Sequence, residues 1–289
     1  MQRLLIVGCG DTVRRALPRL LRHWRVYALV RTRDAELAAQ GVTQILGDLD
    51  RPHTLHRLAG LADAVLHSAP PPDHGDDDPR TRRLLAALAR RGSLPSALIY
   101  ISTSGVYGDC GGARVAETRA ARPSTARARR RVSAECQLRA FGRRSGCRVS
   151  LLRAPGIYAA DRMPLERLRR GLPLFRREDD GYSNHIHAED LARACERALR
   201  CGAANRAYNI CDDQPLLMGD WYDRLADAYG MARLPRLPRV EAEAQLPAMQ
   251  LSFMNESRQL ENRRMHIELG LRLAYPTVDA GIADALRNH

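Results

Sequence analysis

The stretch LIVGCGDTVRRALPRL, residues 5–20, joins a short apolar run to an amphipathic pattern through two glycines. Val13, Leu17 and Leu20 recur at helical spacing, so the second half predicts a helix that starts directly after a buried strand. The unpaired N–H groups and the dipole of such a helix attract phosphate. We therefore interpret this junction as a binding site for the pyrophosphate of a dinucleotide.

The turn between strand and helix lacks one expected glycine. Gly8 permits the tight turn and Gly10 lets the backbone approach a phosphate, but Val13 stands where a third glycine is expected and should push helix and strand apart. Asp11 can cap free N–H groups, yet it also repels a pyrophosphate. An ordinary strand-to-helix turn is the alternative interpretation. The residues expected to contact the pyrophosphate are Gly8, Cys9, Gly10, Asp11 and Thr12.

Strand and helix patterns alternate beyond this turn. Strands are expected at Val26–Val30, Thr43–Leu46 and Ala64–His67, separated by helical segments. Alternation of this kind predicts a parallel sheet. The expected fold is therefore α/β, a Rossmann-type doubly wound parallel sheet with a small, mainly helical C-terminal substrate lobe.

Two arginines follow the second expected strand, where such folds meet the adenosine ribose. Arg31 and Arg33 suit a 2′-phosphate, which favours NADP and leaves NAD as the alternative, although a basic chain also places arginines there by chance. Asp48 is positioned to accept a hydrogen bond from an adenine amino group. Further cofactor contacts are expected at the ends of later strands, from Ser68, Ala69, Pro70 and Ser102.

The chain of 289 residues is long enough for a substantial core, and its charge is strongly basic. The net charge is +13, and all 46 residues counted as lysine or arginine are arginine. Clusters at 127–131 and 167–170 raise the question of nucleic-acid binding. A GC-rich coding bias explains abundant arginine without lysine, and no recognition helix or zinc spacing is present, so we do not expect a nucleic-acid partner.

Seven cysteines are scattered without CxxC spacing, which predicts reduced thiols and indicates neither a disulfide framework nor a metal site. No apolar run approaches the ~20 residues needed to cross a bilayer. The first residues, MQRLLIVGCGD, pass directly into a strand and show no signal peptide. We therefore expect a cytoplasmic protein without membrane contact.

Four later segments carry a family resemblance. Ser102–Gly108 (STSGVYG) resembles the SSxxVYG segment of extended short-chain dehydrogenases/reductases, and Arg153–Tyr158 (RAPGIY) resembles their LRxxxxYG strand end. His185–Ala192 (HIHAEDLA) is similar to their IHVxDLA helix start, and Tyr208–Ile210 to their YNI strand. The chain thus resembles the NAD-dependent epimerase/dehydratase family. Its GCGD start and an expected helix at Arg258–Gly270 resemble the branch of nucleoside-diphosphate-sugar epimerase-like proteins.

The chain departs from that family at its catalytic pair. The family uses a YxxxK motif, in which tyrosine is the general acid/base and lysine lowers its pKa and holds the nicotinamide ribose. The tyrosine position here falls at Arg127 and the lysine position at Arg131. Arg131 can bind a ribose hydroxyl or supply positive potential, whereas Arg127 stays protonated and cannot exchange protons as tyrosine does.

Other residues are candidates for proton transfer. Tyr107 is the leading substitute, because it follows the serine-rich strand end and a nearby arginine can lower its pKa, but a pure packing role is the interpretation we favour. His185 and His187 titrate in the useful range, and one of them is expected at a helix start. By analogy with the family's upstream serine, Ser104 is expected to contact substrate.

Residues 1–160 are expected to form the dinucleotide-binding core, to which 183–212 contribute a last helix and strand. Residues 161–182 and 213–289 are expected to form the substrate lobe. Four lobe arginines suit a phosphate or carboxylate, although solvated helix faces also explain them: Arg162, Arg258, Arg263 and Arg264.

Three functions remain open on this basis. The first is an NADP-dependent oxidoreductase or epimerase acting on a small-molecule substrate, anionic or a sugar nucleotide. The second is a non-catalytic NADP-binding sensor or regulatory protein, and nucleic-acid binding is the weakest. We place the first ahead of the second, because hydride transfer depends chiefly on correct positioning of the cofactor. A homodimer is compatible with the sequence.

Overall fold

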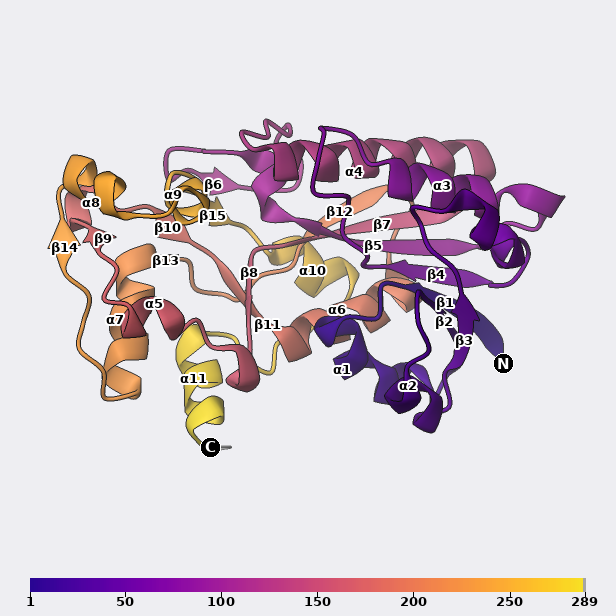
Figure 1. The fold of residues 1–289 in the computed structure, drawn as a ribbon, viewed down its shortest axis with the longest axis horizontal. Helices are drawn as coiled ribbons and strands as arrows, with labels where there is room; N and C mark the ends of the chain where they lie inside the picture. The colour runs from indigo at the N-terminus through magenta and orange to yellow at the C-terminus, as the bar shows by residue number, and fades with distance from the viewer. Residues whose placement is uncertain (288–289) are drawn as a thin grey trace.

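Seven parallel strands form one sheet in the order β12-β7-β5-β4-β1-β2-β3 (Figure 1). The computed structural model describes residues 1–287, except for the side chains of Arg91 and Met249. The strands β2 and β3 are added on one side of β1, and β4 and β5 are added on the other side. Because the strand order reverses between β1 and β4, a crevice opens at the carboxyl ends of these two strands. The strands are β1 (Gln2–Val7), β2 (Trp24–Val30), β3 (Thr43–Leu46), β4 (Ala64–His67), β5 (Ala97–Thr103), β7 (Arg148–Ala154) and β12 (Arg206–Asn209).

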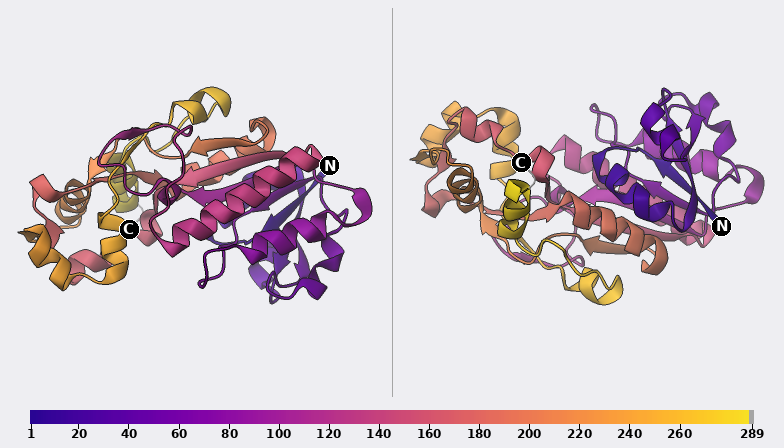
Figure 2. Two further views of the ribbon diagram at one scale, coloured as in Figure 1. Left: turned by 90° about the horizontal axis from the view of Figure 1, so that it is seen from above. Right: turned by 90° about the horizontal axis from the view of Figure 1, so that it is seen from below.

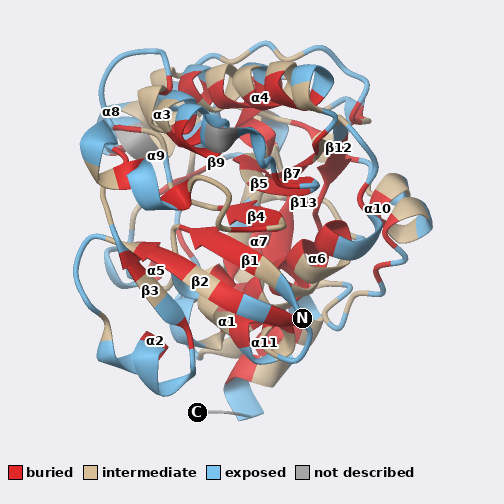
Figure 3. Cartoon of the chain, turned by 90° about the vertical axis from the view of Figure 1, so that its right-hand side faces the viewer, coloured by how far each residue is buried: buried red, intermediate tan, exposed pale blue. Residues whose placement is uncertain are grey.

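The sequence-based expectations for this sheet are confirmed. Thr43–Leu46 and Ala64–His67 are strands with the expected bounds, and Val26–Val30 forms most of β2. The doubly wound α/β fold is therefore the fold of the chain. Buried residues fill the strands, as expected when both faces of a parallel sheet are covered (Figure 3).

Helices cover both faces of the sheet (Figures 1 and 2). On one face, α1 (Asp11–Leu20) packs with α6 (Ala188–Cys201), and their apolar side chains share one core cluster with β1. On the other face, α3 (Pro79–Leu88) and α4 (Ala126–Ser145) contribute to a second core cluster. The short α2 (Ala35–Ala39) follows β2.

Val13 is accommodated within the first cluster. Its side chain is 1% exposed and shares this cluster with the small residues Ala192, Ala194 and Cys195 of α6. The turn before α1 remains tight, because the Ser68 and Ala69 N–H groups still donate to the Val7 carbonyl at 2.8 and 2.9 Å. The missing third glycine is therefore compatible with a close approach of β4 to this turn.

A second lobe lies beyond the carboxyl ends of β5 and β7, on the left in Figure 1. Its helices are α5 (Glu166–Arg169), α7 (Met218–Ala228), α8 (Arg239–Gln245), α9 (Ala248–Met254) and α11 (Val278–Arg287). The helix α10 (Arg263–Glu268) instead packs on the core, beside β12 and α6. Its two-stranded pairs are β8 (Gly156–Tyr158) with β11 (His185–His187), β9 (Leu174–Phe175) with β14 (Arg236–Leu237), β10 (Tyr182–Ser183) with β13 (Leu216–Leu217), and β6 (Arg114–Val115) with β15 (Gln259–Leu260). In the described residues, 1–287, no helix has the length and apolar character to span a membrane.

The expected helix at Arg258–Gly270 is only partly correct. Residues 259–260 are extended as β15, and the helix α10 starts at Arg263. The Asn184 side chain donates to the Arg258 carbonyl and accepts from the Leu260 N–H at 2.9 and 2.8 Å. These backbone groups are therefore held in an extended conformation by a residue far away in the sequence.

Candidate functional site

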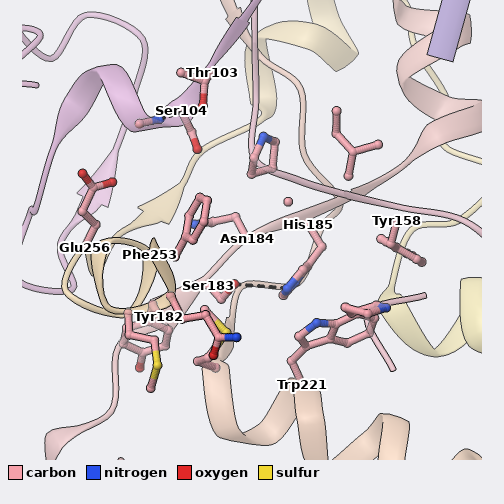
Figure 4. A pocket seen from close by; sticks show the side chains of 18 of the residues that line it. Thr103, Ser104, Tyr158, Tyr182, Ser183, Asn184, His185, Trp221, Phe253 and Glu256 are labelled. Carbon is pink, nitrogen blue, oxygen red and sulfur yellow. Dashed lines mark hydrogen bonds between the residues drawn. The ribbon is translucent and has the colours of Figure 1, made fainter. Parts of the chain in front are cut away.

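Two pockets open along the carboxyl edge of the sheet. The turn pocket, about 580 Å³, lies between the β1–α1 turn and the ends of β2, β3 and β4. The lobe pocket, about 430 Å³, lies between the ends of β5 and β7 and the second lobe (Figure 4). The turn pocket is lined by residues 7–10, 14, 29–35, 37, 47–49, 69, 70 and 80. The lobe pocket is lined by residues 103–105, 127, 155–158, 162, 164, 167, 182–185, 218, 221, 222, 250, 253, 254, 256 and 258.

The two glycines of the turn, Gly8 and Gly10, have different surroundings. Gly8 has a φ of +91°, and a Cβ there would lie 2.4 Å from the Ala69 nitrogen. Only glycine therefore allows this approach. Gly10, the N-cap of α1, would place a Cβ in open space with nothing within 4 Å. Since no side chain caps α1, the start of this ten-residue helix offers free N–H groups beside an open cradle that fits a pyrophosphate.

Asp11 does not act as the expected cap. Its carboxylate pairs with Arg15 of the same helix at 2.9 Å and with Arg162 of the lobe at 3.0 Å. These two cations offset the charge that would repel a pyrophosphate. Asp11 and Thr12 do not line the turn pocket.

Arg31 and Arg33 line the turn pocket, and both are exposed. Within residues 1–287, Arg31 makes no hydrogen bond or ion pair, and Arg33 donates only to the Gln44 carbonyl, at 3.4 Å. Asp34, the acidic residue that follows Arg33 in the chain, accepts from the Leu37 N–H at 3.1 Å and pairs with Arg14. The free charges at this end of the pocket are therefore positive.

The structure brings most of the expected cofactor residues together. The turn pocket contains Gly8, Cys9, Gly10, Arg31, Arg33, Asp48, Ala69 and Pro70. The hydroxyl of Ser68 instead donates to the Gly8 carbonyl, and that of Ser102 donates to buried Glu135 at 2.6 Å. Neither serine lines a pocket. Arg14 lines the turn pocket and was not expected there, although its place one turn into the helix is a signal that the sequence contains.

The two arginines that the sequence interpretation assigns to the family's YxxxK positions have different surroundings. Arg127, near the start of α4, lines the lobe pocket, and its guanidinium lies 4.4 Å from the centre of the Phe253 ring. Arg131 lies one turn later and donates to the Tyr100 hydroxyl at 2.9 Å and the Ile101 carbonyl at 2.8 Å. Arg131 therefore supports the end of β5, whereas Arg127 faces the lobe pocket.

Ser104 and Tyr107 follow β5 but face different environments. Ser104 lines the lobe pocket together with Thr103, the preceding hydroxyl of the same run (Figure 4). Tyr107 is 1% exposed, lines neither pocket, and donates its hydroxyl to Asn209 at 2.7 Å. Burial raises its pKa. This placement supports the packing interpretation of Tyr107.

The two histidines also have different surroundings. His187 is the N-cap of α6 and accepts from the Glu189 N–H at 3.2 Å, which confirms the histidine expected at a helix start. His185 lines the lobe pocket, with Nε2 3.1 Å from the Ser183 hydroxyl and its ring 4.6 Å from Trp221 (Figure 4). Burial lowers the pKa of His185 to about 3, so its ring is neutral at pH 7.

Arginines from both expected basic clusters turn inward. Arg130 and Arg167 are buried, and Arg131 is half-buried against β5. Of the lobe arginines expected to bind anions, Arg162 and Arg258 line the lobe pocket, whereas Arg263 and Arg264 do not. Arg167 and Trp221 also line this pocket, and the sequence alone did not identify them as pocket residues.

A buried carboxyl group lies beside the lobe pocket. Asp212 follows β12, and its backbone N–H donates to the His185 carbonyl at 2.8 Å. Its Oδ2 has no hydrogen-bond partner within the described residues. Burial raises its pKa to about 8.

The Asp212 pKa predicts a pH dependence of stability. Its folded pKa of about 8 lies above the unfolded value, so its contribution is fully present below about pH 4 and is lost as pH rises towards 8. The free energy of unfolding of Asp212→Asn, relative to the parent, should therefore rise between pH 5 and pH 8, by at most about 1.4 kcal/mol per pH unit. Urea unfolding at several pH values measures this. The exposed neighbour Asp213→Asn is the control, and parallel pH curves for Asp212→Asn and the parent would contradict the assignment.

The turn geometry predicts opposite results for two alanine substitutions. Gly8→Ala should cost about 1–3 kcal/mol from backbone strain alone, with a further cost from the clash at Ala69, as measured by urea unfolding. Gly10→Ala should change unfolding by less than about 1 kcal/mol, because no atom lies near its new methyl group. It should nevertheless weaken NADPH binding in calorimetry, because the methyl occupies the cradle. If Gly10→Ala binds NADPH as tightly as the parent, the turn is not part of the cofactor site.

Several solved structures share this fold over almost the whole chain. A functionally unknown conserved protein from Silicibacter pomeroyi is 28% identical, with a TM-score of 0.83 over 100% of this chain and 99% of that one. The dTDP-glucose 4,6-dehydratase DesIV from Streptomyces venezuelae, with NAD and TYD bound, is 21% identical, with a TM-score of 0.77 over 99% and 96% of the two chains. The UDP-glucose 4-epimerase from Thermotoga maritima, with UDP-glucose, is 18% identical, with a TM-score of 0.77 over 99% of both chains.

No curated protein matches the sequence. The family model for the NAD dependent epimerase/dehydratase family matches residues 9–211, which include Gly10, α1, the ends of β5 and β7, and α6. This match agrees with the sheet order, the cradle at the start of α1 and the pocket between core and lobe. The chain belongs to the NAD dependent epimerase/dehydratase family.

Proposed function

We propose that this protein binds NADP along the carboxyl edge of the sheet and transfers a hydride between this cofactor and a small substrate in the lobe pocket. It would act as an oxidoreductase or an epimerase. The observation that carries the proposal is that one sheet edge holds both a phosphate cradle and a substrate-sized cavity. Sugar nucleotides are one substrate class, because the similar dehydratase and epimerase structures contain TYD and UDP-glucose.

The residues of the turn pocket fit a dinucleotide. The free N–H groups at the start of α1 would hold the pyrophosphate beside Gly10, and Asp48 would accept from the adenine. The nicotinamide would supply or accept the hydride when bound. Because Arg31 and Arg33 carry no ion pair while Asp34 is engaged, this end of the pocket suits the 2′-phosphate of NADP.

The lobe pocket offers hydrogen-bond donors in place of the missing tyrosine. We assign Ser104 and Thr103 to bind a substrate carbonyl or hydroxyl oxygen. His185 lines the pocket and Tyr107 does not, so His185 is the better candidate for contact with the substrate. Because burial lowers its pKa to about 3, we assign it as a neutral hydrogen-bond partner of the substrate. Arg131 acts through the end of β5, where it contributes positive potential without an acidic partner.

A non-catalytic NADP-binding protein is the second candidate. It is favoured by one observation, namely that the sequence contains no lysine and therefore cannot supply the family's YxxxK pair. The two functions differ in turnover: an enzyme oxidises NADPH with a carbonyl substrate or interconverts a sugar nucleotide such as UDP-glucose. A sensor binds NADPH without turnover of any such compound.

Calorimetric titration with NADPH and NADH tests the cofactor assignment. NADPH should bind more tightly to the nucleotide-free protein, because Arg31 and Arg33 pair with its 2′-phosphate. Arg31→Ala/Arg33→Ala should weaken NADPH by about tenfold or more, as expected for charge-assisted hydrogen bonds, and should weaken NADH much less.

Arg90→Ala is the matched control, because Arg90 is exposed and lies outside both pockets. An equal loss for the two nucleotides in the double variant would contradict the NADP assignment. Absence of binding by either nucleotide to the parent would contradict the proposed function itself.

A further inference from the structure

A buried arginine without a counterion lines the lobe pocket. Arg167 of α5 is 7% exposed, and its guanidinium contacts only neutral groups: the Met254 sulfur at 3.3 Å, the Pro173 carbonyl and the face of the Tyr222 ring. Its Nε has no hydrogen-bond partner, and no ion pair involves it within residues 1–287. The charge of Asp180 acts on it without a direct contact and does not offset the effect of burial, which lowers the pKa of Arg167. Buried charges are normally paired, because an uncompensated charge is costly to bury. An anion in the pocket would remove this cost.

A second arginine of the same pocket also lacks an acidic partner. Arg127 is exposed at the pocket, makes no ion pair within the described chain, and contacts the Phe253 ring. Burial lowers its pKa, and the charge of Glu256 offsets this only in part. Phe253 and Met254 are neighbours in α9. The guanidinium groups of Arg127 and Arg167 thus contact adjacent residues of one short helix, and both line the same pocket.

The remaining charges of the pocket are already compensated. Glu256 is the single carboxylate among its lining residues, and it pairs with Arg258 at 2.9 Å and accepts from the Ser124 hydroxyl at 2.5 Å. Arg162 pairs with Asp11 at 3.0 Å. The lining of the lobe pocket therefore contains four arginines and one carboxylate. Among the described residues, the two of these arginines that make no ion pair are Arg127 and Arg167.

The rest of the lining is suited to a flat organic group. Aromatic side chains from separate parts of the chain gather here: Tyr158, Tyr182, Trp221, Tyr222 and Phe253 (Figure 4). Aromatic faces bind planar groups by stacking and by apolar contact. The pocket thus combines unpaired positive charge with an aromatic wall.

We infer that the lobe pocket binds an organic oxyanion, a carboxylate or phosphate ester on a planar body, with Arg127 and Arg167 as its cationic partners. This inference rests on the proposed function in one respect, that the lobe pocket receives the substrate. Arg127 thereby provides a fixed charge at the position where related proteins have an acid/base tyrosine. A guanidinium fork is well matched to both oxyanions, which it binds through two parallel hydrogen bonds.

Three probes with the same phenyl body test the inference: benzoylformate, phenyl phosphate and uncharged benzaldehyde. Each is titrated by calorimetry at low salt into nucleotide-free and NADPH-saturated protein. At least one charged probe should bind and benzaldehyde should not, and the ratio of the two charged affinities identifies carboxylate or phosphate as the preferred group. Equal binding of all three probes, or binding of none, would overturn the inference.

Substitutions of Arg127 identify the cation that binds. Arg127→Gln should weaken the preferred probe by about tenfold or more, since it removes a charge-assisted pair, and Arg127→Lys should retain part of the affinity. Arg129→Gln is the matched control on the same helix, because Arg129 pairs with Asp76 and lies outside the pocket. Equal affinities of Arg127→Gln and Arg129→Gln would overturn the assignment.

Arg167→Met keeps the volume of the side chain and removes its charge. It should weaken the probe by a similar factor while the thermal midpoint stays unchanged or rises, because an unpaired buried charge is lost. A lower midpoint with unchanged probe affinity would mean that Arg167 is structural. NADPH binding is measured separately in each sample, so oxyanion binding without NADPH binding contradicts only the proposed function.

Discussion

The close approach of β4 to the β1–α1 turn is the constraint on which the site depends. The Val7 carbonyl accepts two N–H groups from the segment after β4, and the backbone of Ala69 lies where a side chain at Gly8 would be. This contact fixes the start of α1 at the point where the sheet order reverses. The open space at Gly10 and the free N–H groups of α1 follow from it.

The fold was readable from the sequence because local patterns decide it. Apolar runs, helical spacing and the glycine turn predict β1, α1 and the alternating strands, and the structure has them with nearly the same bounds. The prediction of a helix at Arg258–Gly270 was wrong at its start, where the side chain of a distant residue forms hydrogen bonds with the backbone. Asn184 holds residues 258–260 in an extended conformation, and the local sequence around Arg258 does not indicate this contact.

The site was only partly readable, and the reason is again distance along the chain. The β1–α1 turn, Arg31, Arg33 and Asp48 meet in one pocket because they follow strands of one parallel sheet. The Ser102 hydroxyl instead donates to Glu135, 33 residues away in the sequence, and the Tyr107 hydroxyl donates to Asn209, 102 residues away. The lobe residues that complete the second pocket carry no motif, and only the folded lobe brings them to the ends of β5 and β7.

The central proposal is that NADP binds along the carboxyl edge of the sheet, from the β1–α1 turn towards the lobe pocket that holds the substrate. Hydrogen–deuterium exchange with NADPH and with 2′,5′-ADP tests this claim most directly. NADPH should slow exchange both at the β1–α1 turn and at Gly156–Tyr158, whereas 2′,5′-ADP, which lacks the nicotinamide half, should slow exchange only at the turn. Equal protection patterns for the two ligands, without any effect at Gly156–Tyr158, would contradict the account.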